Sequence, residues 1–508
     1  MLSIINSCCV YGMYGHPIQV EVDVSEGLPG FDIVGLPDAS VKESKERVRT
    51  AIKNSGYKFP MKRITVNLAP ADLKKEGPLF DLPIAIGILA ATGQIPDDAR
   101  MRLSAMVGEL SLDGKVRPVP GVLAMSDKIS QLPEIEFFLV PAENAAEAAL
   151  IKGTTIYPVC YLKDLVLFFQ HEYEPIPTEV DGNSLLKEAY QDNSLDMSEV
   201  KGQQGVKRAL EVAAAGCHNV LLSGSPGSGK TMLARRLPSI LPSLTLEESL
   251  ELTRIYSIAG LLPKNQALIT QRPFRAPHHS ASAASLIGGG RIPRPGEISL
   301  ACHGILFLDE MAEYQKTILE ALRQPMEDKF VTITRVEATY SFPAKFQLIG
   351  SLNPCPCGFY GDPVKECTCT PHQIHKYLGK ISGPLLDRID IRMDVPRVEY
   401  QDLSSESVTE SSAQIRQRVE IARKIQEERL AGTGIVCNAH MERKQIQKFC
   451  QTSPDAKKLL KEAFDRLKLS ARSHDRILKV ARTIADLEQS TVIQLHHIAE
   501  AIQYRGTM

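Results

Sequence analysis

Apolar and polar residues follow two periods along the chain, which predict short strands interleaved with amphipathic helices. Residues 18–24 alternate residue by residue, as a half-exposed strand does. Residues 40–55 place apolar side chains at helical spacing among many charges, and residues 82–93 are a dense apolar run that predicts a buried helix. The other elements predicted in this region are two strands and an alanine-rich helix, at residues 63–68, 137–141 and 142–151. This succession predicts an α/β fold.

The pattern changes character along the 508 residues, and a chain of this length is expected to form about three domains. The first predicted domain covers residues 1–170. Residues 171–198 are crowded with proline and acidic residues, which is typical of a linker. A second α/β domain is predicted at residues 199–395, and the pattern of residues 396–508 is mostly helical.

The composition excludes several classes of protein. No apolar run reaches the roughly 18 residues of a membrane span, and the N-terminus lacks the basic region and apolar core of a secretion signal. Eleven cysteines in so long a chain do not resemble a disulfide scaffold, so a cytoplasmic location is expected. Because 59 basic residues balance 60 acidic ones, any binding of nucleic acid has to come from local arginines rather than from a large basic surface.

The most specific motif is G-S-P-G-S-G-K-T at residues 224–231, which matches the phosphate-binding pattern G-x-x-x-x-G-K-[ST]. It follows an apolar strand at 220–222 and opens a helix. Glycines let successive N–H groups point at a triphosphate, while Lys230 is expected to bind the outer phosphates and the Thr231 hydroxyl to ligate Mg²⁺. The residues predicted to bind ATP are Gly224, Ser225, Pro226, Gly227, Ser228, Gly229, Lys230 and Thr231.

Two later apolar strands end in residues that complete such a site. The strand at 305–308 ends in Asp309 and Glu310. A carboxylate at a strand end can hold the Mg²⁺ that Thr231 also touches, so Asp309 is assigned to the metal. Its neighbour Glu310 is assigned as the general base that polarises a water for attack on the γ-phosphate. A further apolar strand delivers Asn353, whose amide can orient that water.

Two arginines are candidates for contact with the γ-phosphate. Arg388 lies in L-L-D-R-I-D-I, from which it can reach the nucleotide of a neighbouring subunit as an arginine finger. The alternative is a salt bridge to Asp387 or Asp390. Arg472 lies in the first turn of a predicted helix and can touch the same phosphates from a lid, with Arg476, one turn later, as the second choice.

Together, the phosphate loop, the Asp-Glu strand end, the strand-end Asn, L-L-D-R and S-A-R resemble an AAA+ ATPase with a helical C-terminal lid. Three further segments resemble the magnesium-chelatase-like ATPases, and specifically their ComM (YifB) branch: P-F-R-A-P-H-H, R-P-G-E-I-S-L-A-C-H-G and L-E-A-L-R-Q-P-M-E-D. The resemblance covers essentially the whole chain. It implies ATP and Mg²⁺ as cofactors and a hexameric DNA motor, associated with branch migration when transforming DNA is integrated. The alternative is a chelatase-type motor that remodels a protein partner.

The resemblance also implies insertions that reach into the pore of a ring. Residues 280–296 are such an insertion, a glycine-rich loop in which Arg291 and Arg294 suit contacts with DNA phosphates. Residues 329–342 alternate like a hairpin, with Arg335 near its turn. Repeated around a ring, the three arginines would form a cationic lining. The alternative is that they form surface ion pairs.

The N-terminal region resembles a Lon-type protease domain, which has the ribosomal-protein-S5 domain 2-like fold. The resemblance rests on the segments at residues 75–86 and 108–122. The position of the nucleophilic serine is Leu79 here, and that of the catalytic lysine is Leu123. Since leucine can neither attack a carbonyl nor accept a proton, the domain is not expected to hydrolyse peptides.

Four cysteines follow Asn353 as two C-x-C pairs within residues 355–369. Four thiolates can close a tetrahedral Zn²⁺ site and fix a loop that has little apolar content, with His372 and His375 as substitute ligands. The alternative is four reduced cysteines on a surface loop. The predicted ligands are Cys355, Cys357, Cys367 and Cys369.

Overall fold

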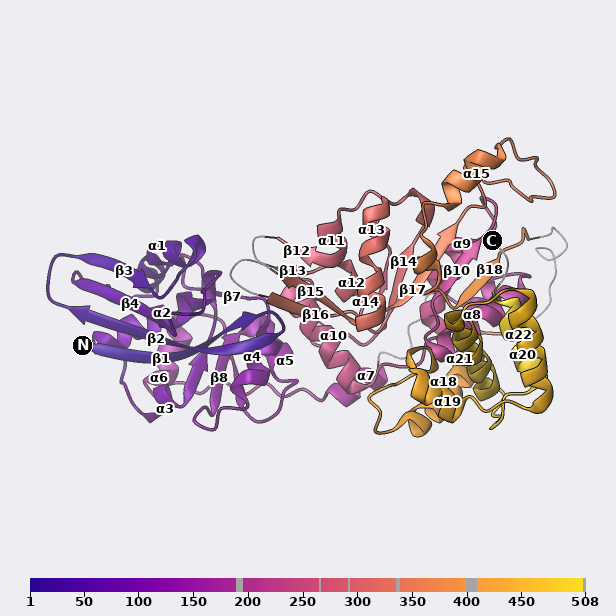
Figure 1. Cartoon of the computed structure of the whole chain (residues 1–508). Coiled ribbons are helices and arrows are strands. Elements are labelled where there is room, and N and C mark those ends of the chain that lie inside the picture. Colours follow the sequence, from indigo (N-terminus) through magenta and orange to yellow (C-terminus); the bar gives the residue numbers. More distant parts are fainter. Residues whose placement is uncertain (189–194, 265, 291–292, 335–338, 399–408, 506–508) are drawn as a thin grey trace. The chain divides into compact units, whose positions relative to one another are not determined.

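The computed structural model describes residues 1–188, 195–264, 266–290, 293–334, 339–398 and 409–505. The chain forms two compact units (Figure 1). Unit 1 contains Met1–Glu188, Leu246–Thr270 and Thr334–Phe342, and unit 2 contains Ala189–Thr245, Gln271–Ile333 and Pro343–Met508. No helix among the described residues is long and apolar enough to cross a membrane. The domain boundaries drawn from the sequence stay predictions.

Unit 1 is built on a seven-stranded sheet in the order β3-β4-β2-β1-β5-β8-β9. β2 pairs antiparallel with β1 and β4, and the other pairs are parallel. The strands are β1 Leu2–Tyr11, β2 Tyr14–Ser25, β3 Gly30–Val34, β4 Arg63–Ala69, β5 Ser104–Met106, β8 Phe137–Pro141 and β9 Thr155–Val159, and a separate ribbon pairs β6 Glu109–Leu110 with β7 Val116–Arg117.

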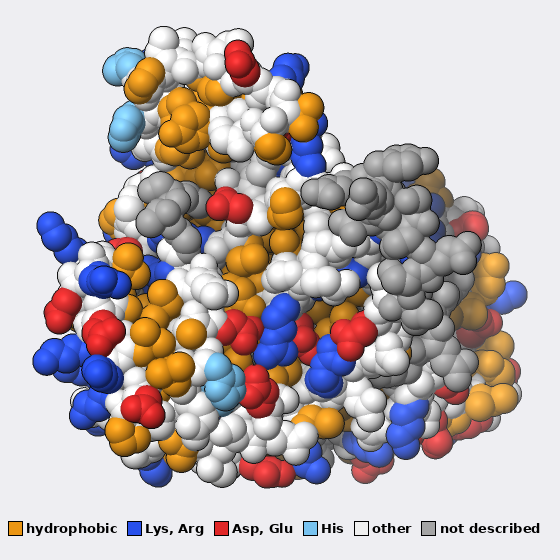
Figure 2. Space-filling view, turned by 90° about the vertical axis from the view of Figure 1, so that its right-hand side faces the viewer, with side chains coloured by type: hydrophobic (Ala, Val, Ile, Leu, Met, Phe, Trp, Pro, Cys, Tyr) orange, Lys and Arg blue, Asp and Glu red, His pale blue; other side chains and the backbone are white. Residues whose placement is uncertain are grey.

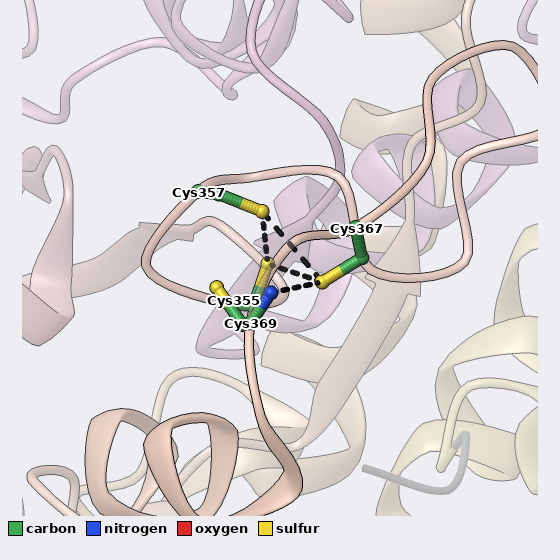
Figure 3. A group of neighbouring side chains, drawn as sticks. All are labelled: Cys355, Cys357, Cys367 and Cys369. Carbon is green, nitrogen blue, oxygen red and sulfur yellow. Dashed lines mark hydrogen bonds between the residues drawn. The ribbon is translucent and has the colours of Figure 1, made fainter.

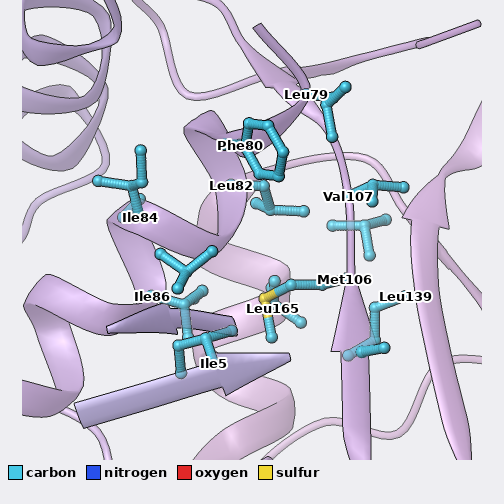
Figure 4. Packing of buried hydrophobic residues seen from close by; sticks show 14 of the residues in the cluster. Ile5, Leu79, Phe80, Leu82, Ile84, Ile86, Met106, Val107, Leu139 and Leu165 are labelled. Atoms are coloured by element: carbon cyan, nitrogen blue, oxygen red, sulfur yellow. The ribbon is translucent and has the colours of Figure 1, made fainter. Parts of the chain in front are cut away.

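The helices of unit 1 include α2, Asp81–Ala91, which is buried along its whole length as its apolar sequence predicted. Figure 4 shows Ile86 of α2 beside Ile5 of β1, in the same buried cluster as Ile84, Phe80 and Leu139 of β8. The remaining helices and 3₁₀ turns are α1 Ala39–Asn54, η1 Pro78–Phe80, α3 Ala99–Arg102, α4 Val122–Ile129, η2 Ala142–Asn144, α5 Ala145–Ala148, α6 Leu162–Phe169, α7 Gly182–Glu188 and α10 Leu246–Ala259.

The alanine-rich helix predicted over residues 142–151 is shorter than expected. It is only the 3₁₀ turn η2 followed by the four residues of α5. The buried Asn144 side chain bonds both backbone groups of Val119, at 3.0 and 3.1 Å, and also Glu147. These tertiary hydrogen bonds fix a turn where alanine content alone favours a helix.

Helix α10 belongs to unit 1 although it follows the phosphate loop in sequence. The Ser257 hydroxyl of α10 accepts a hydrogen bond from the Gly121 amide at 2.9 Å and donates one to the buried Glu147 carboxylate. Burial raises the pKa of Glu147 above its usual range. Arg254 forms an ion pair with Asp127 at 2.9 Å. These partners are far from α10 in sequence, so no local pattern could have predicted the contact.

Unit 2 is built on a parallel five-stranded sheet in the order β11-β14-β17-β10-β18. Because the strands are parallel, β10, β14 and β17 present their carboxyl ends at the same edge, where α/β proteins bind ligands. The strands are β10 Val220–Ser223, β11 Phe274–Arg275, β14 Ile305–Leu308, β17 Gln347–Leu352 and β18 Ile391–Asp394.

Helices of the C-terminal region share one core with helix α8 of the sheet layer. A ribbon in unit 2 pairs β12 Gly288–Gly289 with β13 Arg294–Pro295. The remaining strands are β15 Phe330–Thr334, mostly in unit 2, and β16 Thr339–Pro343, mostly in unit 1. The helices and 3₁₀ turns of unit 2 are η4 Met197–Glu199, α8 Gln204–Gly216, α9 Lys230–Arg236, η5 Leu237–Ile240, α11 Ala283–Ile287, α12 Glu297–Leu300, η6 Met311–Glu313, α13 Lys316–Ala321, α14 Arg323–Asp328, α15 Pro371–Leu378, α16 Gly383–Leu386, α18 Ser412–Leu430, η7 Asn438–His440, α19 Arg443–Phe449, α20 Pro454–Arg466, α21 Ala471–Leu487 and α22 Leu495–Gln503.

Candidate functional site

The predicted phosphate loop connects β10 to α9 and curls around the side chain of Lys230. The Lys230 ammonium donates hydrogen bonds to the carbonyl oxygens of Gly224 at 2.6 Å and Ser225 at 3.0 Å, and to the Asn353 amide oxygen at 3.2 Å. The side chain is buried, and this burial lowers its pKa. Asn353 and Lys230 therefore meet in the structure, although they are far apart along the chain.

Two glycines of the loop adopt left-handed backbone conformations that other residues rarely take. Gly227 has φ of 78° and Gly229 has φ of 91°. Gly224 is restricted by space instead, because a Cβ atom there would lie 2.6 Å from the Val395 carbonyl oxygen. The loop therefore needs glycine at these positions for physical reasons. Gln203, directly before α8, donates from its amide to the Ser228 carbonyl oxygen at 2.8 Å.

The predicted magnesium ligands lie side by side. The Thr231 hydroxyl donates to the Asp309 carboxylate at 3.0 Å. A hydroxyl and a carboxylate at this separation offer two of the oxygen ligands that Mg²⁺ prefers, and a phosphate could supply more. The residues present therefore fit the ion that the sequence implies.

Ser351 of β17 connects the two acidic residues and was missed by the sequence analysis. Its hydroxyl donates to the Asp309 carboxylate and accepts from the Glu310 amide at 2.9 Å. Glu310 has φ of 50°, a strained conformation for a residue other than glycine, which often marks a functional position. A polar residue inside an otherwise apolar strand was the feature that could have identified Ser351.

Arg388 is buried and paired inside its own chain. Its guanidinium forms an ion pair with Glu327 of α14 and donates to the Pro384 carbonyl oxygen at 2.7 Å. Neither Asp387 nor Asp390, the partners considered from the sequence, is its ion-pair partner among the described residues. No hydrogen bond or ion pair within the described part of the chain joins Arg388 to the phosphate loop.

Arg472 lies exposed at the start of α21, where the sequence predicted a helix. The pKa of Glu327 is lowered first by its hydrogen bond to Arg388, and the charge of Arg472 contributes as well. The two predicted arginines therefore lie near one carboxylate. Arg476, the second choice, instead forms an ion pair with the buried Asp390 at 2.6 Å.

Of the three arginines predicted to contact DNA, only Arg294 lies among the described residues. It is exposed on β13, which pairs antiparallel with β12. The insertion at 280–296 thus contains the short helix α11 and a ribbon, where a glycine-rich loop was expected. Arg291 and Arg335 lie outside the described residues. On the face shown in Figure 2, Lys and Arg side chains are intermingled with Asp and Glu.

The two leucines at the protease positions are both part of a packed interior. Leu79 lies in η1 and is 7% exposed, while Leu123 lies in α4 and is fully buried. Figure 4 shows Leu79 near Phe80 and Val107. The two side chains thus contribute apolar packing at these positions.

The four predicted zinc ligands come together between β17 and α15 (Figure 3). The Cys355 sulfur lies 3.3 Å from that of Cys357 and 3.6 Å from that of Cys367, and Cys357 lies 3.6 Å from Cys367. All four sulfurs, including that of Cys369, lie within 4.8 Å of one another. Zinc–sulfur bonds of about 2.3 Å require sulfurs about 3.8 Å apart in a tetrahedron, so the cluster fits zinc. A disulfide bond needs two sulfurs about 2.0 Å apart, so the measured separations of 3.3 to 3.6 Å are too long for one.

Comparisons with known proteins agree with this architecture. Family models for the magnesium chelatase subunit ChlI match residues 20–144 and 196–403, and a model for the C-terminal part of that subunit matches residues 409–505. The chain is 44% identical over 510 residues to the competence protein ComM of Haemophilus influenzae, covering 99% of this chain and 97% of that protein. It is 43% identical over 509 residues to the uncharacterized protein YifB of Escherichia coli, with the same coverage.

A shorter similarity extends to a protease. Lon protease 2 of Bacillus subtilis is 29% identical over 168 residues, which is 30% of this chain and 29% of the protease.

The parallel sheet of unit 2 has the architecture of a P-loop nucleotide-binding protein. A phosphate loop follows β10, and an acid and an amide lie at the ends of neighbouring strands. The chain belongs to the ComM (YifB) family of magnesium-chelatase-like AAA+ proteins. This family and the site together indicate an ATPase that uses Mg²⁺.

Proposed function

We propose that the protein is an ATP-hydrolysing, ring-forming DNA motor that drives branch migration while transforming DNA is integrated. The name of its relative, a competence protein, supports the biological setting. A cytoplasmic location, where such DNA would be handled, is part of the same proposal. DNA, in branched or junction form, and further copies of this chain are the expected partners.

The single observation that carries the proposal concerns the residues expected around ATP. The residues of the phosphate-loop side lie together, whereas Arg388 is bound elsewhere in its own chain. Lys230 is hydrogen-bonded to Asn353, and Thr231 to Asp309. Arg388, in contrast, is held by Glu327 within its own chain. An ATP site shared between subunits explains this division, because the arginine of one copy would act on the nucleotide of the next.

Each residue then has a role in hydrolysis. Lys230 binds the outer phosphates, and Thr231 with Asp309 holds Mg²⁺, which would neutralise phosphate charge. Glu310 accepts a proton from the attacking water while Asn353 orients it. Arg388 from the neighbouring subunit stabilises the charge on the transferred phosphoryl group, and Arg472 closes from the helical lid.

Arginines of the insertions would transmit this cycle to DNA. Arg291, Arg294 and Arg335 are proposed to contact the DNA backbone without reading bases. The intermingled charges in Figure 2 are consistent with contacts made by a few arginines repeated around a ring.

Electron microscopy of the Glu310→Gln variant with ATP and forked DNA tests the proposal. We expect a ring with DNA in its pore, since the variant should bind ATP without hydrolysing it. Junction migration by the unmodified protein, with Lys230→Ala as the inactive control, measures the motor directly. A protein that remains a monomer under all nucleotide and DNA conditions would contradict the proposal.

A chelatase-type motor that remodels a protein partner is the second candidate. The matches to magnesium chelatase family models favour it. The two candidates differ in what stimulates hydrolysis. DNA should increase the ATPase rate of a DNA motor, whereas a protein-remodelling motor should be indifferent to DNA.

For unit 1 we propose the ribosomal-protein-S5 domain 2-like fold of Lon proteases, without their catalytic dyad. The partial similarity to Lon protease 2 and the buried Leu79 and Leu123 support this assignment. ATP-dependent cleavage of unfolded casein would contradict it.

For the cysteine cluster we propose a structural zinc ion held by its four thiolates, supported by the separations of the sulfur atoms.

A further inference from the structure

The segment between β17 and α15, residues 353–370, has no helix or strand of its own. We call it the cysteine loop. Its side chains are largely exposed, as for Tyr360 at 57% and Val364 at 77%. Cys355 and Gly358 are the residues of the loop that are buried. Burial of apolar surface therefore contributes little to holding this segment in one conformation.

The cysteine loop nevertheless packs directly against the phosphate loop. A Cβ atom built on Gly358 would lie 2.6 Å from both Cγ and Cδ of Pro226, so the Gly358 backbone lies closer to the proline ring than a residue with a side chain would permit. Gly358 also has φ of 84°, which favours glycine. The proline that Gly358 touches lies in the middle of the motif that binds phosphate.

A second connection passes through Arg397. Its guanidinium forms an ion pair with Asp362 of the cysteine loop at 3.0 Å, and the Asp362 side chain is only 1% exposed. The same guanidinium nitrogen donates to the Ser225 hydroxyl of the phosphate loop at 3.4 Å. A third connection is covalent, since Asn353, which accepts from Lys230, lies two residues before Cys355.

Backbone amides also surround the sulfur atoms. The Tyr360 amide donates to the Cys355 sulfur at 3.3 Å, and the Cys369 amide donates to the Cys367 sulfur at 3.4 Å. Such bonds from outside the ligand set orient thiolates and stabilise their negative charge. The loop is thus folded around its sulfurs rather than around an apolar core.

We propose that zinc bound by the four cysteines fastens the cysteine loop against the phosphate loop and thereby sets the affinity of the ATP site. The proposal rests on ATP binding at residues 224–231 and on the zinc site proposed above, but not on any action on DNA. Without the ion, Gly358 and Asp362 would lose their fixed positions beside Pro226 and Ser225. The phosphate loop would then have to be ordered by the nucleotide itself, which lowers affinity.

The first experiment measures zinc and nucleotide affinity together. Purified protein should contain about one zinc per chain by elemental analysis. The double variant Cys367→Ser/Cys369→Ser should lose the zinc and bind a fluorescent ATP analogue about fivefold more weakly or worse. Cys160→Ser, an exposed thiol of unit 1, is the matched control and should change neither quantity.

A second experiment breaks the contact and leaves the ligands in place. Gly358→Ala should keep its zinc but bind the ATP analogue more weakly, because the new methyl group collides with Pro226. Gly361→Ala is the control, since Gly361 has a similar φ of 76° but no atom within 4 Å of its added Cβ. Equal nucleotide affinity in the two variants would overturn the coupling even if the cysteine variants were merely misfolded.

A third measurement uses the unmodified protein. Coupling between two sites is reciprocal, so the ATP analogue should slow the loss of zinc to a chelator and tighten zinc binding by the same factor. Absence of zinc, or zinc loss unaffected by nucleotide, would refute the proposal. Failure of the unmodified protein to bind ATP at all would instead refute the proposed function, so the two failures are distinguishable.

Discussion

Ser351 shows how one hydroxyl positions two acidic residues of the nucleotide site. It donates to Asp309 and accepts from the Glu310 amide. We expect Ser351→Ala to bind ATP nearly as well as the unmodified protein but to hydrolyse it about tenfold more slowly or worse, because Asp309 and Glu310 lose their common anchor. Steady-state hydrolysis and fluorescent nucleotide binding measure the two effects separately.

The control for this prediction is Ser299→Ala. Ser299 is also fully buried, but its hydroxyl has no hydrogen-bond partner among the described residues. If both serine variants reduced hydrolysis equally, the effect would be one of general packing, and the positioning role of Ser351 would be wrong.

Lys230 is the residue on which phosphate binding depends most. Its ammonium already faces two carbonyl oxygens of the loop and the Asn353 amide oxygen, and those contacts can be exchanged for phosphate oxygens. We expect Lys230→Ala to weaken ATP binding about a hundredfold, because the variant loses a buried positive charge that faces the phosphates. The exposed Arg235 on the same helix provides the control, since Arg235→Ala should bind ATP normally.

At this scale the sequence predicted the residues that form a contiguous motif or end an apolar strand. It did not predict Ser351, Gln203 or Glu327. Each of them acts through one hydrogen bond or ion pair to a distant residue. Such a distant partner is determined by the tertiary fold, and its position leaves no recognisable spacing in the sequence.

Between elements, Asp390 links the start of β18 to the lid helix α21. Its buried carboxylate pairs with Arg476 at 2.6 Å and contacts His218 at 3.3 Å. Burial alone would raise the pKa of Asp390, but Arg476 and then His218 outweigh it and hold the pKa well below the usual range. We expect Asp390→Asn to lower the free energy of unfolding by about 3 kcal/mol at neutral pH, because Arg476 loses its buried partner.

The lowered pKa of the Asp390 carboxyl also predicts how the free energy of unfolding depends on pH. Since its pKa is depressed on folding, Asp390 stabilises the fold above the ordinary carboxyl pKa of about 3.9, and this stabilisation is lost as pH falls below that value. Urea midpoints measured between about pH 5 and pH 2 should therefore fall less steeply for Asp390→Asn than for the unmodified protein. Asp387→Asn, a half-buried neighbour, should retain the full slope. Parallel slopes for all three proteins would contradict this assignment.

Elements marked by a helical period or by a continuous apolar run were predicted well. Helices α1 and α2 and strands β8, β10 and β14 agree closely with the sequence pattern. The predictions failed where distant partners decide the local structure, as for α5, where Asn144 bonds Val119. The ribbon and the short helix α11 in the insertion were missed as well, because glycine-rich sequence is compatible with many conformations.

For the whole molecule, the shared ATP site predicts complementation between two inactive variants. Arg388→Ala should abolish hydrolysis while ATP binding stays mostly intact, because the arginine would act on the neighbouring subunit. The Lys230→Ala subunit supplies an intact Arg388, but its own phosphate loop lacks the lysine that binds phosphate. Mixed rings of the two variants should therefore regain part of the hydrolysis, at each interface that combines the intact halves.

Each variant alone provides the baseline, and Glu327→Gln is a further comparison. That variant frees Arg388 from its partner in the same chain and should retain hydrolysis if Arg388 acts on a neighbour. If mixtures were as inactive as the separate variants while still forming rings, the site would not be shared.

The sequence by itself determined the phosphate loop, the acid and amide at the strand ends, the pair of C-x-C motifs and the family, because all of these are encoded in short segments with fixed spacing. Only the tertiary structure decided that Arg388 pairs with Glu327, that α10 packs in unit 1, and that Gly358 lies against Pro226. These facts depend on which distant segments the fold brings together. Packing of the whole chain, rather than local periodicity, fixes that choice.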